Sequence, residues 1–158
     1  MSYLIDGNNV MGQRVGWHRD RVRARRELLD ELARFALMKK ARVAVVFDGA
    51  PDEHFADGAS YRGVRVFYAL RGSNADERIK SLVESSRERR TLFVVTSDRA
   101  LSDYVRRCGA QVLRAGEFRR RMEEANAEST TGNTDAPPIE ETTERWMRYF
   151  GVAPEDDE

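Results

Sequence analysis

The chain has 158 residues, of which 41% are hydrophobic, and its 27 basic side chains balance 27 acidic ones. A chain of this length can bury one good core and is too short for two, so we expect one domain with an appendage. No apolar run approaches the roughly 18 residues of a membrane span, and no signal-type segment precedes the first predicted strand. These features argue against a membrane protein and favour a soluble protein of the cytoplasm.

The single cysteine and the distribution of charge narrow the class further. Cys108 excludes an internal disulfide and a cysteine-cluster metal site, which agrees with a reducing compartment. Residues 1–124 carry 25 Lys and Arg against 18 Asp and Glu, whereas residues 125–158 carry 2 against 9. A basic surface around an acidic pocket suits a polyanion, although from charge alone an ordinary solvated surface is the better interpretation.

Three apolar segments, each followed by an aspartate, are predicted as strands. The segments and their acids are residues 3–5 with Asp6, residues 42–47 with Asp48, and residues 91–96 with Asp98. The carboxyl ends of neighbouring parallel strands form a crevice in which ligands bind. We therefore expect the three aspartates to share one site at that edge of the sheet.

Between the first two strands the pattern predicts a loop at residues 12–17 and then a helix capped by Asp20 that runs to about Met38. The polar face of this helix and the residues before it carry Arg19, Arg21, Arg23, Arg25 and Arg26. These arginines can bind phosphates or simply be solvated, and the pattern does not decide between the two.

After the second strand, residues 50–63 have no clean period and are predicted as a long loop that contacts substrate. Residues 64–70 are predicted as a strand towards the sheet edge, because an arginine interrupts them. A helix capped by Ser73 or Asn74 follows, with Asp76 on the face that packs against the sheet. We expect this helix to run to about residue 90.

The last part of the predicted domain is a short helix ending at Gly109, a strand at residues 110–113 and a basic helix at residues 117–124. Residues 125–138 are predicted as a linker, and residues 139–158 as a C-terminal helix with an acidic tail. The alternation of strands and helices predicts an α/β fold whose five-stranded sheet is mostly parallel and covered by helices on both faces.

Four carboxylates would meet in the predicted pocket, namely Asp6, Asp48, Asp76 and Asp98. Such groups repel one another and stay ionised together only beside cations. Hard oxygen ligands without a histidine cluster favour Mg²⁺ or Mn²⁺ over zinc. A divalent ion held in this way can activate water for an in-line phosphoryl displacement, which is the chemistry of a metal-dependent nuclease.

Other polar residues are candidates for contacts around the pocket. Asn9 can orient a ligand carboxylate or a water, whereas Asn8 is better explained by turn chemistry. Thr96 and Ser97 can hydrogen-bond the pocket, although the ordinary role of Ser97 would be to cap the next helix. The candidate substrate contacts are Asn9, Arg19, Arg23, Arg71 and Ser97.

Other catalytic systems have little support in the sequence. Neither a Gly-x-Gly-x-x-Gly motif after the first strand nor a P-loop is present, so we expect no nucleotide cofactor. His18 and His54 both fall in predicted loops, which leaves a serine or cysteine triad without an obvious base.

The acidic motifs, in their order and spacing, resemble the YacP-like branch of the NYN domains, which are relatives of the PIN nucleases. They are Leu-Ile-Asp-Gly-Asn-Asn-Val at residues 4–10, Val-Val-Phe-Asp-Gly at 45–49, Asn-Ala-Asp-Glu-Arg-Ile at 74–79 and Val-Thr-Ser-Asp at 95–98. The resemblance covers residues 3 to about 124, and residues 139–151 look like the family's C-terminal helix.

The resemblance implies a PIN-like three-layer fold with strand order 3-2-1-4-5 and a divalent-metal endoribonuclease activity. It carries the family's acids onto Asp6, Asp48, Asp76 and Asp98, and it matches the family's asparagine with Asn9. It also implies RNA as the partner, in particular mRNA cleaved on or near the ribosome. Asn8 departs from the pattern, since an aromatic residue often stands there, and Asp103 is left out because Glu-Gln can occupy its segment in the family.

Two functions from different classes follow from these observations. The first is a metal-dependent endoribonuclease, in which the aspartates hold the ion and arginines of the first long helix and of residues 50–63 guide RNA. The second is a catalytically weak RNA- or ribosome-binding module of the same fold. The carboxylates argue against the second function, because a pure RNA binder would gain affinity by losing those negative charges.

Overall fold

The computed structural model describes residues 1–13, 16–49, 51, 53–69 and 72–131. The strands are β1 (Ser2–Asp6), β2 (Arg42–Phe47), β3 (Ala59–Tyr61), β4 (Val64–Tyr68), β5 (Leu92–Val95) and β6 (Gln111–Leu113). The helices are α1 (Gly7–Met11), α2 (Arg21–Lys39), α3 (Ala75–Ser85), α4 (Arg99–Arg107) and α5 (Ala115–Thr131), with short 3-10 helices η1 (Trp17–Arg19) and η2 (Arg89–Thr91).

The strands form one six-stranded sheet in the order β3-β4-β2-β1-β5-β6. β1 lies between β2 and β5 and is parallel to both, so that Tyr3 is in register with Val43 and with Phe93. The five predicted strands keep their expected order relative to one another. The prediction of five strands is nevertheless wrong, because β3 adds an antiparallel edge strand and makes the sheet mixed.

The extra strand arises from a tight hairpin that the sequence pattern did not suggest. The two residues between β3 and β4 are Arg62 and Gly63, with φ of 49° and 89°. Positive φ at both central positions is the requirement of a type I′ hairpin turn, which Asn-Gly signals better than Arg-Gly does. The arginine that suggested an edge strand, Arg65, is 2% exposed, and its Nη1 donates to the Gly58 carbonyl at 2.6 Å. Covered by β3, β4 is therefore the second strand from the edge.

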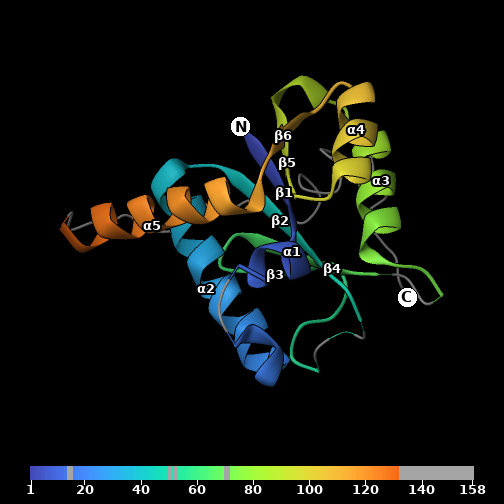
Figure 1. Ribbon diagram of the computed structural model, residues 1–158. Helices are drawn as coiled ribbons and strands as arrows, with labels where there is room; N and C mark the ends of the chain where they lie inside the picture. Colours follow the sequence, from blue (N-terminus) through green and yellow to red (C-terminus); the bar gives the residue numbers. More distant parts are fainter. Residues whose placement is uncertain (14–15, 50, 52, 70–71, 132–158) are drawn as a thin grey trace.

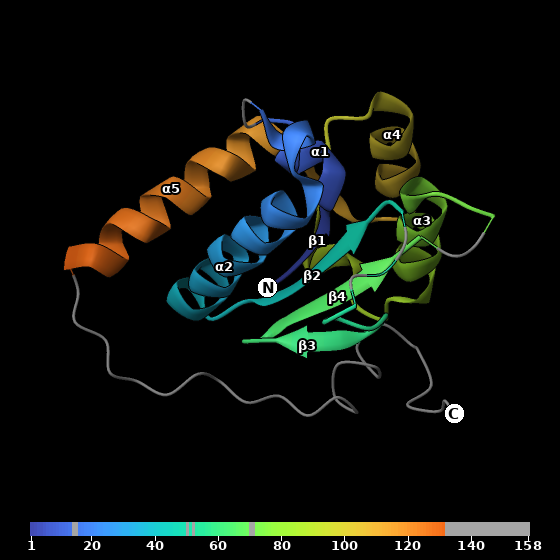
Figure 2. The same ribbon diagram turned by 90° about the horizontal axis from the view of Figure 1, so that it is seen from below.

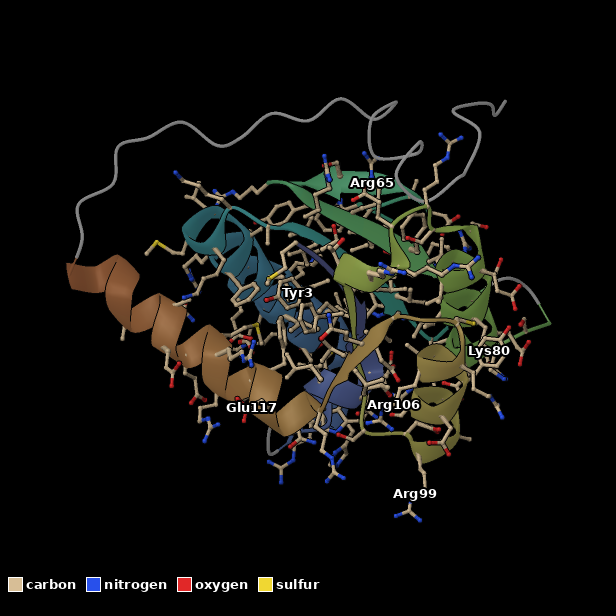
Figure 3. The ribbon with its side chains drawn as sticks, turned by 90° about the horizontal axis from the view of Figure 1, so that it is seen from above. Tyr3, Arg65, Lys80, Arg99, Arg106 and Glu117 are labelled. Carbon is tan, nitrogen blue, oxygen red and sulfur yellow. The ribbon has the colours of Figure 1, made fainter. Side chains whose placement is uncertain are left out.

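Helices cover both faces of the sheet (Figures 1 and 2), with α2 and α5 on one face and α3 and α4 on the other. Alternate residues of β1 point to opposite layers: Tyr3 and Ile5 pack under α2 and α5, and Leu4 packs under α3 and α4. Tyr3, in the interior in Figure 3, contacts the rings of Phe35, Phe93 and Phe118 at centroid distances of 5.1, 5.4 and 5.7 Å. The core is thus two apolar layers separated by the sheet.

The end of β1 continues directly into α1, a one-turn helix where we expected an irregular turn. Gly7 permits this close passage, because a Cβ there would lie 2.6 Å from the Phe47 ring and 2.9 Å from the Val46 carbonyl oxygen. Val10 and Met11 are buried at 0% and 2% exposure, so α1 is part of the core. Burial of these apolar side chains holds a helix that would be too short to form alone.

The helices also differ from prediction at their ends. α3 ends at Ser85 instead of near residue 90. α5 continues to Thr131, seven residues into the stretch predicted as a linker. The extension has a packing reason, because Ala125 is fully buried and Asn126 accepts a hydrogen bond from Arg34 Nε of α2 at 3.2 Å. The helix predicted at residues 139–158 lies outside the described residues. Among the described helices, none is long and apolar enough to cross a membrane.

Candidate active site

Four segments bring their aspartates to the edge of the sheet at which the parallel strands end. Asp6 is the last residue of β1, and Asp48 directly follows β2. Asp98 follows β5 by three residues and is the N-cap of α4, whereas Asp76 is the second residue of α3. Because β2, β1 and β5 are adjacent and parallel, the three strand-end acids share one rim, as expected.

Asp6 is the most buried of the four, with 6% of its surface exposed. Its Oδ2 accepts a hydrogen bond of 3.0 Å from Oγ1 of Thr96, which is itself fully buried. Burial, with a further contribution from the charges of Asp76 and Asp48, raises the pKa of Asp6 from 3.8 to about 6, against the lowering effects of Thr96 and of the Asn9 backbone. Asp6 thus sits in an apolar environment and within electrostatic range of two other carboxylates.

Asp76, near the start of α3, is an electrostatic neighbour of the strand-end aspartates. The pKa of Asp76 is raised by burial first, then by Asp98, and also by Asp48, while Lys80 lowers it. Lys80 belongs to α3 (Figure 3), and its Nζ lies 5.1 Å from the ring centroid of Tyr104 on α4. The prediction that Asp76 faces the sheet agrees with full burial of Ile79 and Val83 on the same face and with exposure of Glu77.

The four aspartates are therefore electrostatic neighbours, but they do not form a closed ligand set. Among the described residues, no group of three or more His, Cys, Asp and Glu side chains is close enough to hold a metal ion as it stands. Asp98 Oδ1 accepts a hydrogen bond of 2.9 Å from Leu101 N as the cap of α4.

The four aspartates nevertheless offer oxygen ligands of the type that hard divalent cations prefer. All four side chains are carboxylates, and burial followed by the neighbouring carboxylates raises the pKa values of Asp6 and Asp76. A divalent cation at the rim would favour the ionised form of these groups, and oxygen ligands suit Mg²⁺ or Mn²⁺. The residues that could hold the ion are Asp6, Asp48, Asp76 and Asp98.

Asn8 and Asn9 connect α1 to the two neighbouring strand ends. Asn8 Oδ1 accepts from the Asp48 backbone N–H at 2.9 Å, and Asn9 Oδ1 accepts from the Ser97 N–H at 2.8 Å. The interpretation of Asn8 as local turn chemistry is wrong, since its partner lies 40 residues away. The sequence signal for both roles was the pair of amides that follows the strand-end acid after one glycine.

Thr96 and Ser97 also hold the rim together. Thr96 Oγ1 accepts from the Asp98 N–H at 3.1 Å, in addition to donating to Asp6. Ser97 does not cap α4, because Asp98 does; its Oγ instead accepts from the Ala115 N–H at 3.1 Å and anchors the start of α5. Ser97 is thus engaged structurally, and nothing in its contacts marks it for substrate.

One arginine that contacts the rim, Arg25, was not among the predicted substrate contacts. Arg25 Nη2 donates to the Asp48 carbonyl at 2.5 Å, and its guanidinium lies 5.2 Å from the Phe47 ring centroid. Arg23 is exposed and pairs with Glu27 at 3.0 Å, and Arg19 is exposed at the end of η1. Arg71 lies outside the described residues. The signal for Arg25 was its place in the arginine run, which did not distinguish it from its neighbours.

A second arginine missed by the sequence argument fixes the loop beside the rim. Arg78, two residues after Asp76, pairs with Asp57 at 3.1 Å and donates to the Tyr68 carbonyl at 2.9 Å. Asp57 also accepts from the Tyr68 N–H at 2.9 Å. Asp57, in the segment predicted as a long loop, is thereby tied to β4 and α3.

The chain is an α/β protein whose sheet carries helices on both faces and acids from four segments at its carboxyl rim. The sequence pattern of a PIN-like nuclease family, described as the YacP-like NYN domain, matches residues 3–148. The chain belongs to this family, as its motifs indicated.

Solved structures agree with this assignment. The crystal structure of Rae1 (YacP) from Bacillus subtilis matches with a TM-score of 0.72 and 24% identity, over 83% of this chain and 78% of that one. A crystal structure of a mutant of the same protein matches with a TM-score of 0.68 and 26% identity, over 80% of this chain and 77% of that one. No curated protein sequence matches this chain.

Proposed function

We propose that this protein is a metal-dependent endoribonuclease that hydrolyses phosphodiester bonds of RNA. The observation that carries the proposal is the placement of four aspartates from four segments at the strand-end rim, where burial and neighbouring carboxylates raise the pKa values of Asp6 and Asp76. A folded protein tolerates such a cluster when a ligand compensates for its electrostatic cost. Membership of the YacP-like NYN family supports the view that this cluster of aspartates belongs to a nuclease.

In this proposal each residue at the rim has a defined task. Asp6, Asp48, Asp76 and Asp98 hold Mg²⁺ or Mn²⁺. Bound there, the ion would polarise a phosphate oxygen and make a water molecule more acidic. Asn8 and Asn9 keep the Asp48 and Ser97 backbones beside Asp6. Attack by water in line with the leaving oxygen would give products with a 5′-phosphate and a 3′-hydroxyl.

Positive charge near the rim would position the RNA backbone. Arg25 places a guanidinium beside the Asp48 carbonyl, and Arg19 and Arg23 lie exposed around the start of the same helix. The family resemblance favours mRNA at the ribosome as the substrate, which would place the activity in the cytoplasm.

The test is cleavage of an end-labelled structured RNA and of an mRNA on translating ribosomes, each with Mn²⁺ or with EDTA. We expect Mn²⁺-dependent cleavage by the wild type and a loss of at least about 100-fold in Asp6→Asn and Asp76→Asn. Glu77→Gln is the matched control, because Glu77 is exposed beside Asp76 and pairs with Lys80 at 3.4 Å.

Cleavage that survives both EDTA and the Asp6→Asn substitution would remove the proposal. Binding of RNA or ribosomes without Mn²⁺-dependent cleavage would instead support the binding module of the same fold.

A further inference from the structure

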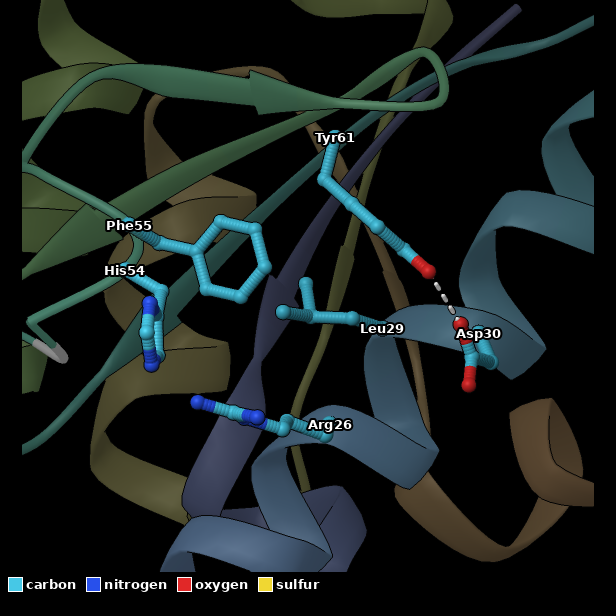
Figure 4. A pocket seen from close by; sticks show the side chains of 6 residues that line it. All are labelled: Arg26, Leu29, Asp30, His54, Phe55 and Tyr61. Atoms are coloured by element: carbon cyan, nitrogen blue, oxygen red, sulfur yellow. Dashed lines mark hydrogen bonds between the residues drawn. The ribbon is translucent and has the colours of Figure 1, made fainter.

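A pocket of about 280 Å³ opens between α2 and the segment that leads into β3 (Figure 4). Its lining residues are Arg26, Leu29, Asp30, His54, Phe55 and Tyr61. The rings of Phe55 and Tyr61 meet edge to face, with centroids 5.3 Å apart. The volume is close to the lower limit of small-molecule sites, roughly 300 Å³, which suits one flat ring system.

The walls of the pocket are held by contacts from outside it. The Tyr68 hydroxyl donates to the Phe55 carbonyl at 2.8 Å, and Arg78 pairs with Asp57 two residues further along the chain. Tyr61 belongs to β3 and is fixed by its pairing with Val64 of β4. The pocket therefore exists before any ligand arrives, which reduces the entropy lost on binding.

Asp30, on the side of the pocket formed by α2, supplies a carboxylate with a defined orientation. The Tyr61 hydroxyl donates to Asp30 Oδ1 at 2.5 Å, and Figure 4 shows this bond at the side of the pocket away from His54 and Phe55. This bond fixes the carboxylate but uses only one lone pair of Oδ1, so both oxygens can still accept hydrogen bonds from a ligand. An acceptor beside aromatic and aliphatic walls selects a flat ring with N–H donors on its edge.

The pocket is close to the proposed cleavage site. Arg26 lines the pocket, and the preceding residue, Arg25, contacts the Asp48 carbonyl at 2.5 Å. Asp30 is five residues beyond Arg25, or about 8 Å along the helix axis. In the view of Figure 4 the Arg26 guanidinium points towards the His54 ring, at the side of the pocket opposite Asp30.

We propose that this pocket binds a guanine base of the substrate RNA, with Asp30 accepting hydrogen bonds from its Watson–Crick edge and Phe55 packing against its ring. The inference rests on the proposed function, since it takes RNA as the ligand. Guanine is the best match to a carboxylate because its N1–H and N2–H₂ donors lie side by side. Cytosine and adenine present a single amino group on that edge and uracil a single N–H.

Binding is tested separately from cleavage, with the full chain in EDTA. GMP, AMP, CMP and UMP are titrated in turn, and backbone amide shifts of residues 26–30 and 54–61 are followed by NMR. The four probes share ribose and phosphate, so a difference between them reports the base. We expect GMP to bind about tenfold more tightly than the others, the low end of the discrimination of one good bidentate contact.

Three variants separate recognition from structure. Asp30→Asn should abolish the preference for GMP. Tyr61→Phe removes the hydrogen bond between Tyr61 and Asp30 but keeps the carboxylate, so it should retain the preference for GMP even if it melts at a lower temperature. Asp103→Asn, an exposed acid on α4 with 61% side-chain exposure, is the charge-matched control.

Equal binding of the four nucleotides to the wild type would overturn the inference, as would a GMP preference that survives in Asp30→Asn. Loss of the preference in Tyr61→Phe as well would also overturn it, because Asp30 would then act only through the fold. GMP selectivity without Mn²⁺-dependent RNA cleavage would leave the base pocket in place and defeat the nuclease proposal instead.

Discussion

At the scale of single residues, Asp6 carries the clearest electrostatic cost. It is 6% exposed, and burial raises its pKa from an ordinary 3.8 to about 6. The Thr96 hydroxyl and the Asn9 backbone offset part of that cost without removing it. A carboxylate kept in such a place reduces the stability of the metal-free protein at neutral pH, as functional groups often do.

The pH dependence of stability should show this cost directly. The folded protein binds the Asp6 proton more tightly than the unfolded chain does, so in EDTA this residue lowers stability as pH rises from about 3.8 to about 6. Relative to wild type, Asp6→Asn should therefore gain stability across that window, by about 3 kcal/mol in all. Urea unfolding at pH 4, 5, 6 and 7.5 measures the difference, and a constant difference would contradict the assigned burial effect.

At the scale of elements, α1 acts as a clamp between two strand ends. Successive residues of a helix are separated by about 100°, so two adjacent amides can reach strands on opposite sides. Asn8 binds the backbone after β2 and Asn9 the backbone after β5. One turn of helix thus sets the spacing between the segments that carry Asp48 and Asp98.

Removing one side of this clamp should affect activity more than stability. Asn9→Ala leaves the Ser97 N–H without its 2.8 Å partner, which should cost about 1 kcal/mol of unfolding free energy. Cleavage should fall by about tenfold or more, because the Asp98 segment is no longer held against α1. The measurements are urea unfolding and RNA cleavage under identical Mn²⁺ concentrations.

Asn126→Ala is the matched control for this prediction. It removes an amide that accepts from Arg34 Nε at 3.2 Å, between α2 and α5 and away from the strand-end rim. It should cost comparable stability and leave cleavage unchanged. Equal losses of activity in the two variants would mean that Asn9 acts only through stability.

At the scale of the whole molecule, four chain segments meet at one rim although residues 6 and 98 are far apart in sequence. A ligand that binds this rim binds only the folded chain and therefore stabilises it. Mn²⁺ at about 100 times its dissociation constant should add about 2.7 kcal/mol at pH 7.5, which raises the melting temperature by several degrees. The rise should shrink at pH 5, where Asp6, with a pKa of about 6, holds its proton.

Calorimetry with and without Mn²⁺ measures this shift, and Asp6→Asn and Asp76→Asn should reduce it at pH 7.5. A shift of equal size in the variants would place the ion elsewhere on the protein.

Prediction from sequence worked best where the signal was local and repeated. Apolar runs followed by Asp6, Asp48 and Asp98 identified three strand ends, because a buried strand tolerates a carboxylate only where it leaves the core. It was less successful for α1 and β3, where a buried turn of helix and an Arg-Gly hairpin depend on neighbours far along the chain. The extent of α5 was likewise decided by packing, since Ala125 is buried against partners that the local composition does not reveal.

By itself the sequence determined the α/β alternation, the relative order of five strands through the family resemblance, and the acids that end the strands. Only the tertiary structure decided which polar groups meet there: Thr96 with Asp6, Asn8 with Asp48, Asn9 with Ser97, and Arg25 with the Asp48 carbonyl. The physical reason is the distance along the chain over which each kind of signal acts. Periodicity and turn preference act within a few residues, whereas a hydrogen bond between residues 6 and 96 depends on which strands lie side by side.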